Sequence, residues 1–328
     1  MFLFRTVAMA IAAANIFGCN AMIAFRQQHQ HPLIHHNNAI RDQTYFNGPC
    51  RTTASTTTTT FLSAVKLSPP TSHLSSFFFN NNSTNILTNS KLIYFPLPGR
   101  GEAIRLALTI SNISFTDHRI PFRSWGSEKT TTIWGTLPIL ELSSDDGSTT
   151  TCTRLGQSRS ILRFVGKHTG LYPTTTSIDG VDAYLYAQRI DELMDALEDL
   201  GTAVGGVGVG LEKEDLEVTR KLDATKENGV VYGMLHKIDT FIAEMGNNNY
   251  AVGNSLTIAD LLTFTSMGRL AGGVYFGIPA TVCDPFENIQ NVRRKVGQDQ
   301  RVREWYDERK RVGKLSPAEQ VLSNCRDM

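Results

Sequence analysis

Apolar and polar residues alternate from about residue 90 onward in a way that predicts a series of short strands and helices. In chain order these are strand Lys91–Phe95, helix Gly101–Ser111, strand Ser114–Arg119, an irregular stretch over Pro121–Trp134, strand Leu137–Leu142, a strand near Thr153–Leu155 and helix Ser158–His168. Strands joined through a helix are parallel, whereas the two strands of a hairpin are antiparallel. This part is therefore predicted to be a mixed four-stranded sheet, in the order βαβαββα, with helices packed on it. The connection Ser143–Arg154 is expected to be a surface loop.

The pattern becomes purely helical after Ser177. The predicted helical segments are Val181–Gly201, Leu216–Met245, Leu261–Leu270, Pro285–Gly297 and Gln300–Arg311, with a glycine-valine break over Gly201–Gly210. Thr257 and Asp260 have the spacing of a capping box at the start of one of these helices. We expect an α/β domain over residues 89–171, followed by an all-α domain over residues 178–315.

The first 88 residues differ in composition from the rest and are predicted to be a targeting segment. Met1–Ala24 has one arginine, an apolar run and a small-residue end, which is typical of a signal peptide. Residues 25–88 are rich in Ser, Thr and Asn and contain Asp42 as their one acidic residue, which is the composition of a transit peptide. Together they resemble the bipartite plastid address of algae with secondary plastids. Secretion or the endoplasmic reticulum, and a mitochondrial precursor, are the alternatives.

Overall composition narrows the possible partners. The chain has 328 residues, 41% of them hydrophobic, and a formal net charge of +1. This balance argues against nucleic acid as the main partner, because phosphate binding requires a basic excess on some face. Five scattered cysteines without a CxxC pair indicate free thiols in a reducing compartment, and neither a disulfide framework nor a metal site is predicted. No membrane span is expected in the mature form.

Candidate chemistry begins at Tyr94, which stands at the end of the first predicted strand. Arg100 and Arg105 lie at and just beyond the start of the next helix. A phenol at a strand end that faces a helix N-terminus can stabilise an anion between them. These residues alone do not identify the anion, and strand context alone also allows Tyr94 to be a packed aromatic side chain.

Further motifs follow downstream in a fixed order. They are Arg100-Gly-Glu-Ala-Ile-Arg105 after Tyr94-Phe95, the pair Trp125 and Lys129, Leu137-Pro138, Gln157-Ser158, and Asn254-Ser-Leu-Thr257-Ile-Ala-Asp260-Leu. In this order and spacing the chain resembles the cytosolic glutathione S-transferases, most closely the sigma-like class, from Lys91 to about Lys310. The resemblance implies that the first domain is thioredoxin-like.

The resemblance also implies a site for glutathione as co-substrate, beside a small electrophile and without a further cofactor. The implied glutathione-binding residues are Tyr94, Arg100, Trp125, Lys129, Leu137, Pro138, Gln157, Ser158 and Asp199. Trp125 and Lys129 would contact the glycine end, and Leu137, before a cis Pro138, would pair with the cysteinyl backbone. Gln157 and Ser158 would hold the γ-glutamyl group. Asp199 would reach the glutathione amine across a homodimer.

Tyr94 is the implied catalytic residue, as hydrogen-bond donor to the thiolate. A hydrogen bond to a charged group is worth about 1.5–3 kcal/mol, or roughly one to two pKa units, so one hydroxyl makes the thiolate a major species. The thiolate is the nucleophile. The implied function is conjugation of glutathione to apolar electrophiles, as in detoxification. A glutathione-dependent isomerase or peroxidase, and a non-catalytic binding or structural protein, remain alternatives.

Two positions depart from the family pattern. Thr136 stands where the family usually has glutamine before the Leu-Pro pair, which weakens that side-chain contact. Gly156 replaces a bulkier residue before Gln157.

Overall fold

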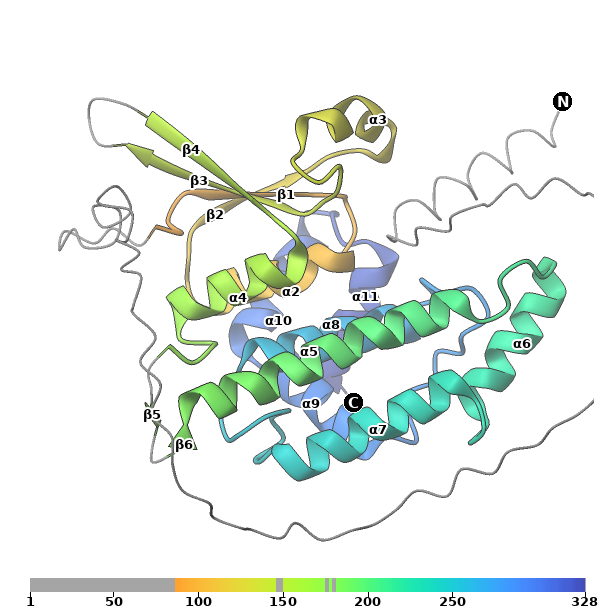
Figure 1. Cartoon of the computed structure of the whole chain (residues 1–328). Coiled ribbons are helices and arrows are strands. Elements are labelled where there is room, and N and C mark those ends of the chain that lie inside the picture. The colour runs from red at the N-terminus through yellow and green to blue at the C-terminus, as the bar shows by residue number, and fades with distance from the viewer. Residues whose placement is uncertain (1–85, 146–149, 175–176, 179–180, 328) are drawn as a thin grey trace, which may run out of the picture. The chain divides into compact units, whose positions relative to one another are not determined.

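A computed structural model describes residues 86–145, 150–174, 177–178 and 181–327 (Figure 1). The first part contains β1 (Ser90–Tyr94), η2 (Gly99–Gly101), α2 (Glu102–Ile110), β2 (Phe115–Arg119), η3 (Phe122–Ser124), α3 (Trp125–Glu128), η4 (Lys129–Thr131), β3 (Ile139–Asp145), β4 (Thr150–Gly156) and α4 (Ser158–Thr169). The strand order is β2-β1-β3-β4. β1 is parallel to β2 and antiparallel to β3, and β3 is antiparallel to β4. The predicted mixed sheet is confirmed.

The core of this domain lies between the sheet and helices α2 and α4. Leu92 of β1 and Leu140 of β3 are fully buried, and they face Ile104 and Leu108 of α2 and Leu162 of α4 in one apolar cluster. Both helices lie on the same side of the sheet in Figure 1. The described fold already includes Leu87, which is fully buried, although the composition placed it in the targeting segment.

The prediction of a surface loop over Ser143–Arg154 was wrong for Ser143–Asp145 and Thr150–Arg154, and its middle, residues 146–149, lies outside the described residues. β3 and β4 pair continuously from Ile139 opposite Gly156 to Asp145 opposite Thr150. The segment alternates poorly because it is rich in Ser and Thr, yet β-branched threonines favour extended backbone and the ladder itself needs no apolar face.

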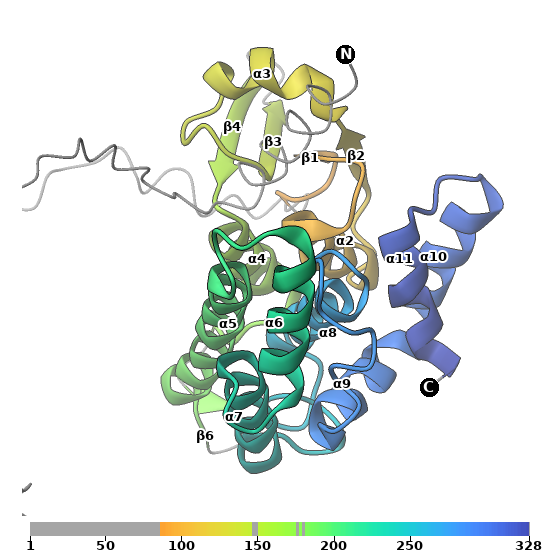
Figure 2. The ribbon, with the colours of Figure 1, turned by 90° about the vertical axis from the view of Figure 1, so that its right-hand side faces the viewer.

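The second part is helical, with α8 at its centre (Figures 1 and 2). After the short strands β5 (Ser177–Ile178) and β6 (Val181–Asp182) come α5 (Ala183–Gly206), α6 (Lys213–Thr225), α7 (Val230–Met245), α8 (Ile258–Ala271), α9 (Glu287–Gly297), α10 (Gln300–Arg311), α11 (Pro317–Ser323) and η5 (Asn324–Asp327). α8 is buried on most of its surface, and α5, α9 and α11 pack around it. No helix in the described part of the chain is long and apolar enough to span a bilayer.

The start of α8 is fixed by the predicted capping box. The Asp260 carboxylate accepts hydrogen bonds from the Thr257 backbone N–H at 2.7 Å and from the Thr257 hydroxyl at 2.8 Å. The other oxygen of Asp260 accepts the Ala251 N–H at 2.6 Å, which ties the preceding loop to the helix. The capping box is confirmed.

Helix boundaries differ from the predictions in two places. The expected glycine-valine break at Gly201–Gly210 begins later, because α5 continues to Gly206 with Val204 fully buried. The stretch Leu216–Met245 is two helices. The Asp223 carboxylate near the end of α6 accepts hydrogen bonds from the backbone N–H groups of Val230 and Val231. These bonds fix the start of α7 as a separate helix.

The helical part also continues beyond residue 315. Ser316 and Glu319 form a second capping box, at the start of α11. Leu322 of α11 packs so closely on Gly268 of α8 that a Cβ at Gly268 would lie 2.0 Å from a Leu322 methyl carbon. α11 is therefore an integral part of the fold.

Candidate active site

Strand register brings the predicted site residues to one edge of the sheet. Ile93 of β1 pairs with Ile139 of β3, which in turn pairs with Gly156 of β4. The next residues along these strands are Tyr94, Pro138 and Gln157. The Leu137–Pro138 peptide bond is cis, as the sequence predicted. Three parts of the candidate site therefore meet where β1 ends, β3 begins and α4 starts.

Tyr94 is buried, and its hydroxyl is held by the loop that follows it. Its Oη accepts a hydrogen bond from the Arg100 backbone N–H at 2.9 Å. Gly99 has a φ of 43°, and a Cβ there would lie only 2.5 Å from the Tyr94 Oη. At Gly101 a Cβ would lie 2.7 Å from the Tyr94 ring. The two glycines thus allow the loop to wrap around the phenol, and its O–H proton remains free to be donated.

Electrostatics keep Tyr94 protonated. Burial raises the pKa of Tyr94 above its usual value, although the hydrogen bond from Arg100 and the charges of Arg269, Arg105 and Arg100 act in the opposite direction. Since the net pKa is raised, the side chain is a phenol near neutral pH. It can therefore act as a hydrogen-bond donor to an anion and is not poised to act as a base.

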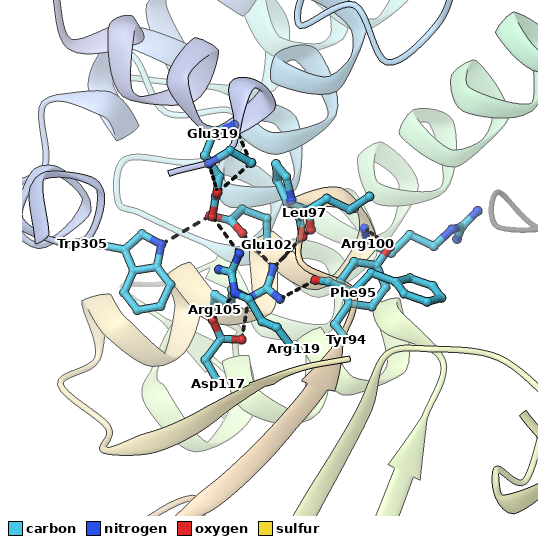
Figure 3. Close-up of polar contacts among 12 residues, drawn as sticks. Tyr94, Phe95, Leu97, Arg100, Glu102, Arg105, Asp117, Arg119, Trp305 and Glu319 are labelled. Atoms are coloured by element: carbon cyan, nitrogen blue, oxygen red, sulfur yellow. Dashed lines mark hydrogen bonds and ion pairs between the residues drawn. The ribbon is translucent and has the colours of Figure 1, made fainter. Parts of the chain in front are cut away.

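Arg105 holds the backbone of the loop that follows Tyr94. Its guanidinium is fully buried and donates to the carbonyl oxygens of Leu97 at 2.9 Å and Phe95 at 3.3 Å (Figure 3). The same group pairs with Glu102 at 3.0 Å and with Asp117 of β2 at 2.8 Å. It also lies 5.6 Å from the centre of the Tyr94 ring. Arg105 is thus a structural residue that holds the Tyr94 loop to the sheet.

The ion-pair network continues to the C-terminal helices. Asp117 pairs with Arg119 at 2.6 Å, and Arg119 pairs with Glu319 of α11 at 3.0 Å (Figure 3). Burial by itself would raise the pKa of Asp117, but Arg105 and Arg119 outweigh it and hold the pKa below its usual value. Residues far apart in sequence are therefore linked through one network of buried charges.

Glu102 carries the other branch of this network. Its carboxylate accepts hydrogen bonds from the Tyr306 hydroxyl at 2.9 Å and the Trp305 indole N–H at 3.3 Å, both in α10.

A cavity of about 410 Å³, measured out to its open mouth, lies beside this loop between the two domains. Its lining comes from the η2–α2 segment, α4, α5 and α8, and comprises Gly99, Arg100, Ala103, Ile104, Ser158, Arg159, Leu162, Leu197, Glu198, Leu262, Thr265, Ser266 and Arg269. The Tyr94 hydroxyl lies close to two of these lining residues, because it accepts the Arg100 N–H and a Cβ at Gly99 would lie 2.5 Å from it. The cavity has an apolar side and a charged side, and the phenol of Tyr94 lies next to the loop that lines it.

The structure brings some predicted residues into the cavity and leaves others around it. Arg100 and Ser158 line it, and the free N–H groups at the start of α4 are typical of a carboxylate site. Gln157 stands just before α4 in a left-handed conformation, with φ at 70°. Trp125 packs edge-on against Phe95, with ring centres 5.7 Å apart, so the α3 segment lies next to the Tyr94 loop.

Lys129 and Asp199 have exposed side chains. The Lys129 stem lies near Gly135 in the loop that leads to the cis proline, since a Cβ at Gly135 would be 3.4 Å from its Cε. Asp199 does not line the cavity, and its predicted role across a homodimer stays a prediction. The acidic residue that lines the cavity is its neighbour Glu198, which pairs with Arg100.

Sequence reasoning missed three features of the site. Glu198 shares a face of α5 with Asp191 and Asp195, which pair with arginines of α4, so this acidic run is largely paired. Arg269 lines the cavity from α8 but carries no motif. Gly156 lies under the ring of Trp134, where a Cβ would be 2.8 Å from Trp134 Cδ1. The glycine that departs from the family pattern therefore makes room for a tryptophan.

Known proteins match this chain in sequence and in structure. The family model described as "Glutathione S-transferase, C-terminal domain" matches residues 209–309. Probable glutathione S-transferase 8 of Caenorhabditis elegans is 31% identical over 229 residues, which cover 68% of this chain and 98% of that protein. Human hematopoietic prostaglandin D synthase is 29% identical over 174 residues, which cover 53% of this chain and 75% of that protein.

A solved structure shows the same fold. The monomeric glutathione S-transferase Na-GST-3 of the hookworm Necator americanus superposes with a TM-score of 0.52 at 25% identity. The match covers 68% of this chain and 98% of the hookworm protein.

Proposed function

Because the chain belongs to the glutathione S-transferase family, we propose that Tyr94 is its catalytic residue and that glutathione binds beside Tyr94 at the edge of the sheet. The enzyme is a glutathione transferase with the thioredoxin-like and all-α domains of the cytosolic type. The motif set places it nearest the sigma-like class. The observation that carries the proposed mechanism is the buried Tyr94 hydroxyl, which accepts one hydrogen bond and retains its own proton.

Conjugation then follows from ordinary chemistry at this hydroxyl. A free cysteinyl thiol has a pKa of about 8.5, so only a few per cent is thiolate near neutral pH. A hydrogen bond from Tyr94 to the charged sulfur is worth about 1.5–3 kcal/mol and lowers the thiol pKa by roughly one to two units. The thiol proton passes to water, and the thiolate sulfur attacks the electrophilic carbon. The carbon–sulfur bond forms as the bond to the leaving group breaks, and the leaving group departs with its electron pair. Tyr94 stays a phenol throughout, because its raised pKa opposes proton loss.

The remaining contacts to glutathione are inferred from the family resemblance, and the position of these residues near the end of the sheet supports them. Ser158 and the start of α4 would hold the γ-glutamyl carboxylate. The backbone at Leu137, before the cis Pro138, would pair with the cysteinyl unit, and Trp125 and Lys129 would hold the glycine end. Glutathione enters as co-substrate, without a resident cofactor.

Conjugation of a neutral aryl halide tests this proposal. The purified protein should convert the halide in the presence of glutathione and bind to a glutathione matrix. The Tyr94→Phe variant should still bind the matrix, since the ring packing is retained, but conjugate far more slowly. Matrix binding without conjugation by the wild type would instead indicate a binding protein. Equal conjugation rates in the wild type and Tyr94→Phe would exclude Tyr94 as the catalytic residue.

An isomerase is the second candidate, because human hematopoietic prostaglandin D synthase is among the relatives. The same thiolate could add to a substrate and leave again, which returns glutathione unchanged. Product analysis separates the two, since a transferase consumes one glutathione per turnover and an isomerase consumes none.

We further propose that the enzyme is a homodimer. Ile133 and Trp134 are 69% and 63% exposed on the loop before β3, and a neighbouring apolar pair this exposed is typical of an interface. Asp199, also exposed, would then face the partner's glutathione. Light scattering tests this, with Trp134→Ala expected to shift the protein toward monomer. A wild-type monomer would contradict it.

The plastid address proposed from composition concerns residues outside the described part of the chain. Met1–Ala24 would act as a signal peptide, and the Ser- and Thr-rich segment that follows as a transit peptide. A fluorescent protein fused after these segments should accumulate in the plastid of an alga with secondary plastids. Fluorescence in the medium or in mitochondria would support one of the two alternatives.

A further inference from the structure

Arg269 of α8 has no carboxylate partner within the ranges that the structure describes. It lines the cavity beside the Tyr94 loop, and its side chain is half-buried. Its Nε is enclosed by protein and meets no acceptor. A guanidinium removed from water is costly unless an anion or hydrogen-bond acceptors replace the lost hydration. A guanidinium that has one enclosed N–H without an acceptor and lines a cavity is therefore suited to bind an anion that enters this cavity.

The other cavity arginines differ from Arg269 in this respect. Arg100 pairs with Glu198, and Arg159 pairs with Asp195 at 2.8 Å. Both are therefore compensated from α5. Of the three guanidinium groups that line the cavity, two are paired with Glu198 and Asp195, so the positive charge left over is that of Arg269.

The position of Arg269 suits contact with the second substrate. Its terminal nitrogen lies 3.6 Å from where a Cβ of Gly201 would stand, so the guanidinium reaches α5 one turn beyond Leu197 and Glu198, which line the cavity. Among the three arginines that influence the Tyr94 hydroxyl, Arg269 has the largest charge effect. The carboxylates of glutathione are accounted for by α4 and the α3 segment in the proposed binding mode. The apolar residues Ile104, Leu162, Leu197 and Leu262 form the rest of the wall.

We propose that Arg269 selects electrophiles that carry a carboxylate, by pairing with that carboxylate while the apolar walls hold the rest of the substrate. This inference rests on the proposed transferase function and names its substrate class. Arg269 is then a specificity-determining residue, and neutral electrophiles are the poorer substrates of this enzyme.

A matched pair of aryl chlorides tests the inference. A chlorodinitrobenzoate, with chlorine para to the carboxylate, is compared with the corresponding benzamide. In both, the thiolate electron pair forms the carbon–sulfur bond, and the carbon–chlorine bond breaks to release chloride. The ring carboxylate or amide takes no part in these bond changes. Division of each enzymatic rate by its uncatalysed rate removes the difference in intrinsic reactivity between the two rings. The remaining difference then reports on the group that Arg269 would contact.

The wild type should prefer the benzoate over the benzamide in kcat/KM. Arg269→Gln should reduce this preference about tenfold or more, because it removes a charge-assisted pair. The rate on the benzamide should fall much less than the rate on the benzoate, because Arg269 also acts on the Tyr94 hydroxyl that both reactions use. Arg269→Lys should restore most of the preference, and Arg303→Gln, at an exposed arginine of α10, should leave it intact.

Other outcomes would overturn the inference. Equal losses on both substrates in Arg269→Gln would show that Arg269 stabilises the thiolate instead, and unchanged rates would show that it has no role in selection. If the wild type converts neither substrate, the proposed transferase function fails and the inference fails with it.

A competition experiment on the wild type alone tests the inference without relying on variants that fold correctly. The unreactive dinitrobenzoate should inhibit benzamide conjugation at roughly tenfold lower concentration than dinitrobenzamide does. Equal inhibition by the two compounds would contradict the inference.

Discussion

Replacement of Glu319 by glutamine should destabilise the whole fold, although Glu319 lies near the C-terminus and outside the cavity. Its side chain is fully buried. Its carboxylate accepts hydrogen bonds from Arg309 at 2.7 Å, from Arg119 at 3.0 Å and from the Ser316 backbone N–H at 2.7 Å. Glutamine has a similar size, but it removes the charge that two largely buried arginines share.

The magnitude follows from the burial of the partners. Arg119 and Arg309 are only 13% and 11% exposed at their side chains, so neither can regain full hydration when Glu319 is lost. Removal of one partner from a buried ion pair costs about 3–5 kcal/mol. For a domain of this size, each kcal/mol shifts the melting temperature by about 2–4 °C, so the expected loss is about 6–20 °C.

Acidity provides a second test of the same contact. Burial alone would raise the pKa of Glu319, but the hydrogen bonds from Arg309 and Ser316 and the charge of Arg119 hold it below its usual value. A carboxylate with a lowered pKa stabilises the fold above its unfolded pKa of about 4.3, and this contribution is lost as pH falls through the folded-state pKa. The deficit of Glu319→Gln should therefore be complete near neutral pH and shrink below about pH 4.

Thermal unfolding by circular dichroism measures both effects. Glu308→Gln is the matched control, because Glu308 pairs with Arg311 in the same region but on the exposed surface, and it should leave the midpoint unchanged. A Glu319→Gln midpoint equal to that of the wild type at neutral pH, or a deficit that does not vary with acidity, would refute the role given to this buried carboxylate.

Three further predictions concern close packing and thiol reactivity. Gly268→Val should cost about 1–3 kcal/mol in denaturant unfolding, because a Cβ at Gly268 would lie 2.0 Å from α11; an unchanged midpoint would contradict this packing. Gly99→Ala should slow conjugation even at temperatures well below its melting temperature, because the added methyl group would lie 2.5 Å from the Tyr94 hydroxyl. Full activity of this variant would contradict the prediction. Among the described cysteines, exposed Cys152 should react first with a thiol reagent followed by mass spectrometry, whereas burial raises the pKa of Cys283 to about 12 and should protect it until unfolding.

The sequence predicted the elements that local chemistry determines. Periodicity placed β1, α2 and α10 closely, and the Leu137–Pro138 turn and the Thr257 capping box were both identified from short motifs. The capping box at Ser316 and Glu319 has the same type of signal, Ser-x-x-Glu, and it was available in the sequence although the prediction ended before it.

Features that depend on tertiary contacts could not be predicted in this way. Arg105 looks like a surface charge in its helix, and its burial depends on Asp117 from another strand. Whether Glu198 or Asp199 faces the cavity depends on one step of helical rotation, which an acidic run does not specify. Arg269 has no motif at all, because its significance comes from the absence of a carboxylate partner in the described part of the cavity wall.

The most direct test of the account is the pKa of the glutathione thiol when it is bound to the enzyme. Titration of thiolate absorbance in the complex measures it, with the wild type and Tyr94→Phe compared at saturating glutathione. The account predicts a thiol pKa roughly one to two units below that of free glutathione in the wild type, and a return toward about 8.5 in Tyr94→Phe. An identical thiol pKa in the two proteins would contradict the assignment of Tyr94 as the donor to the sulfur.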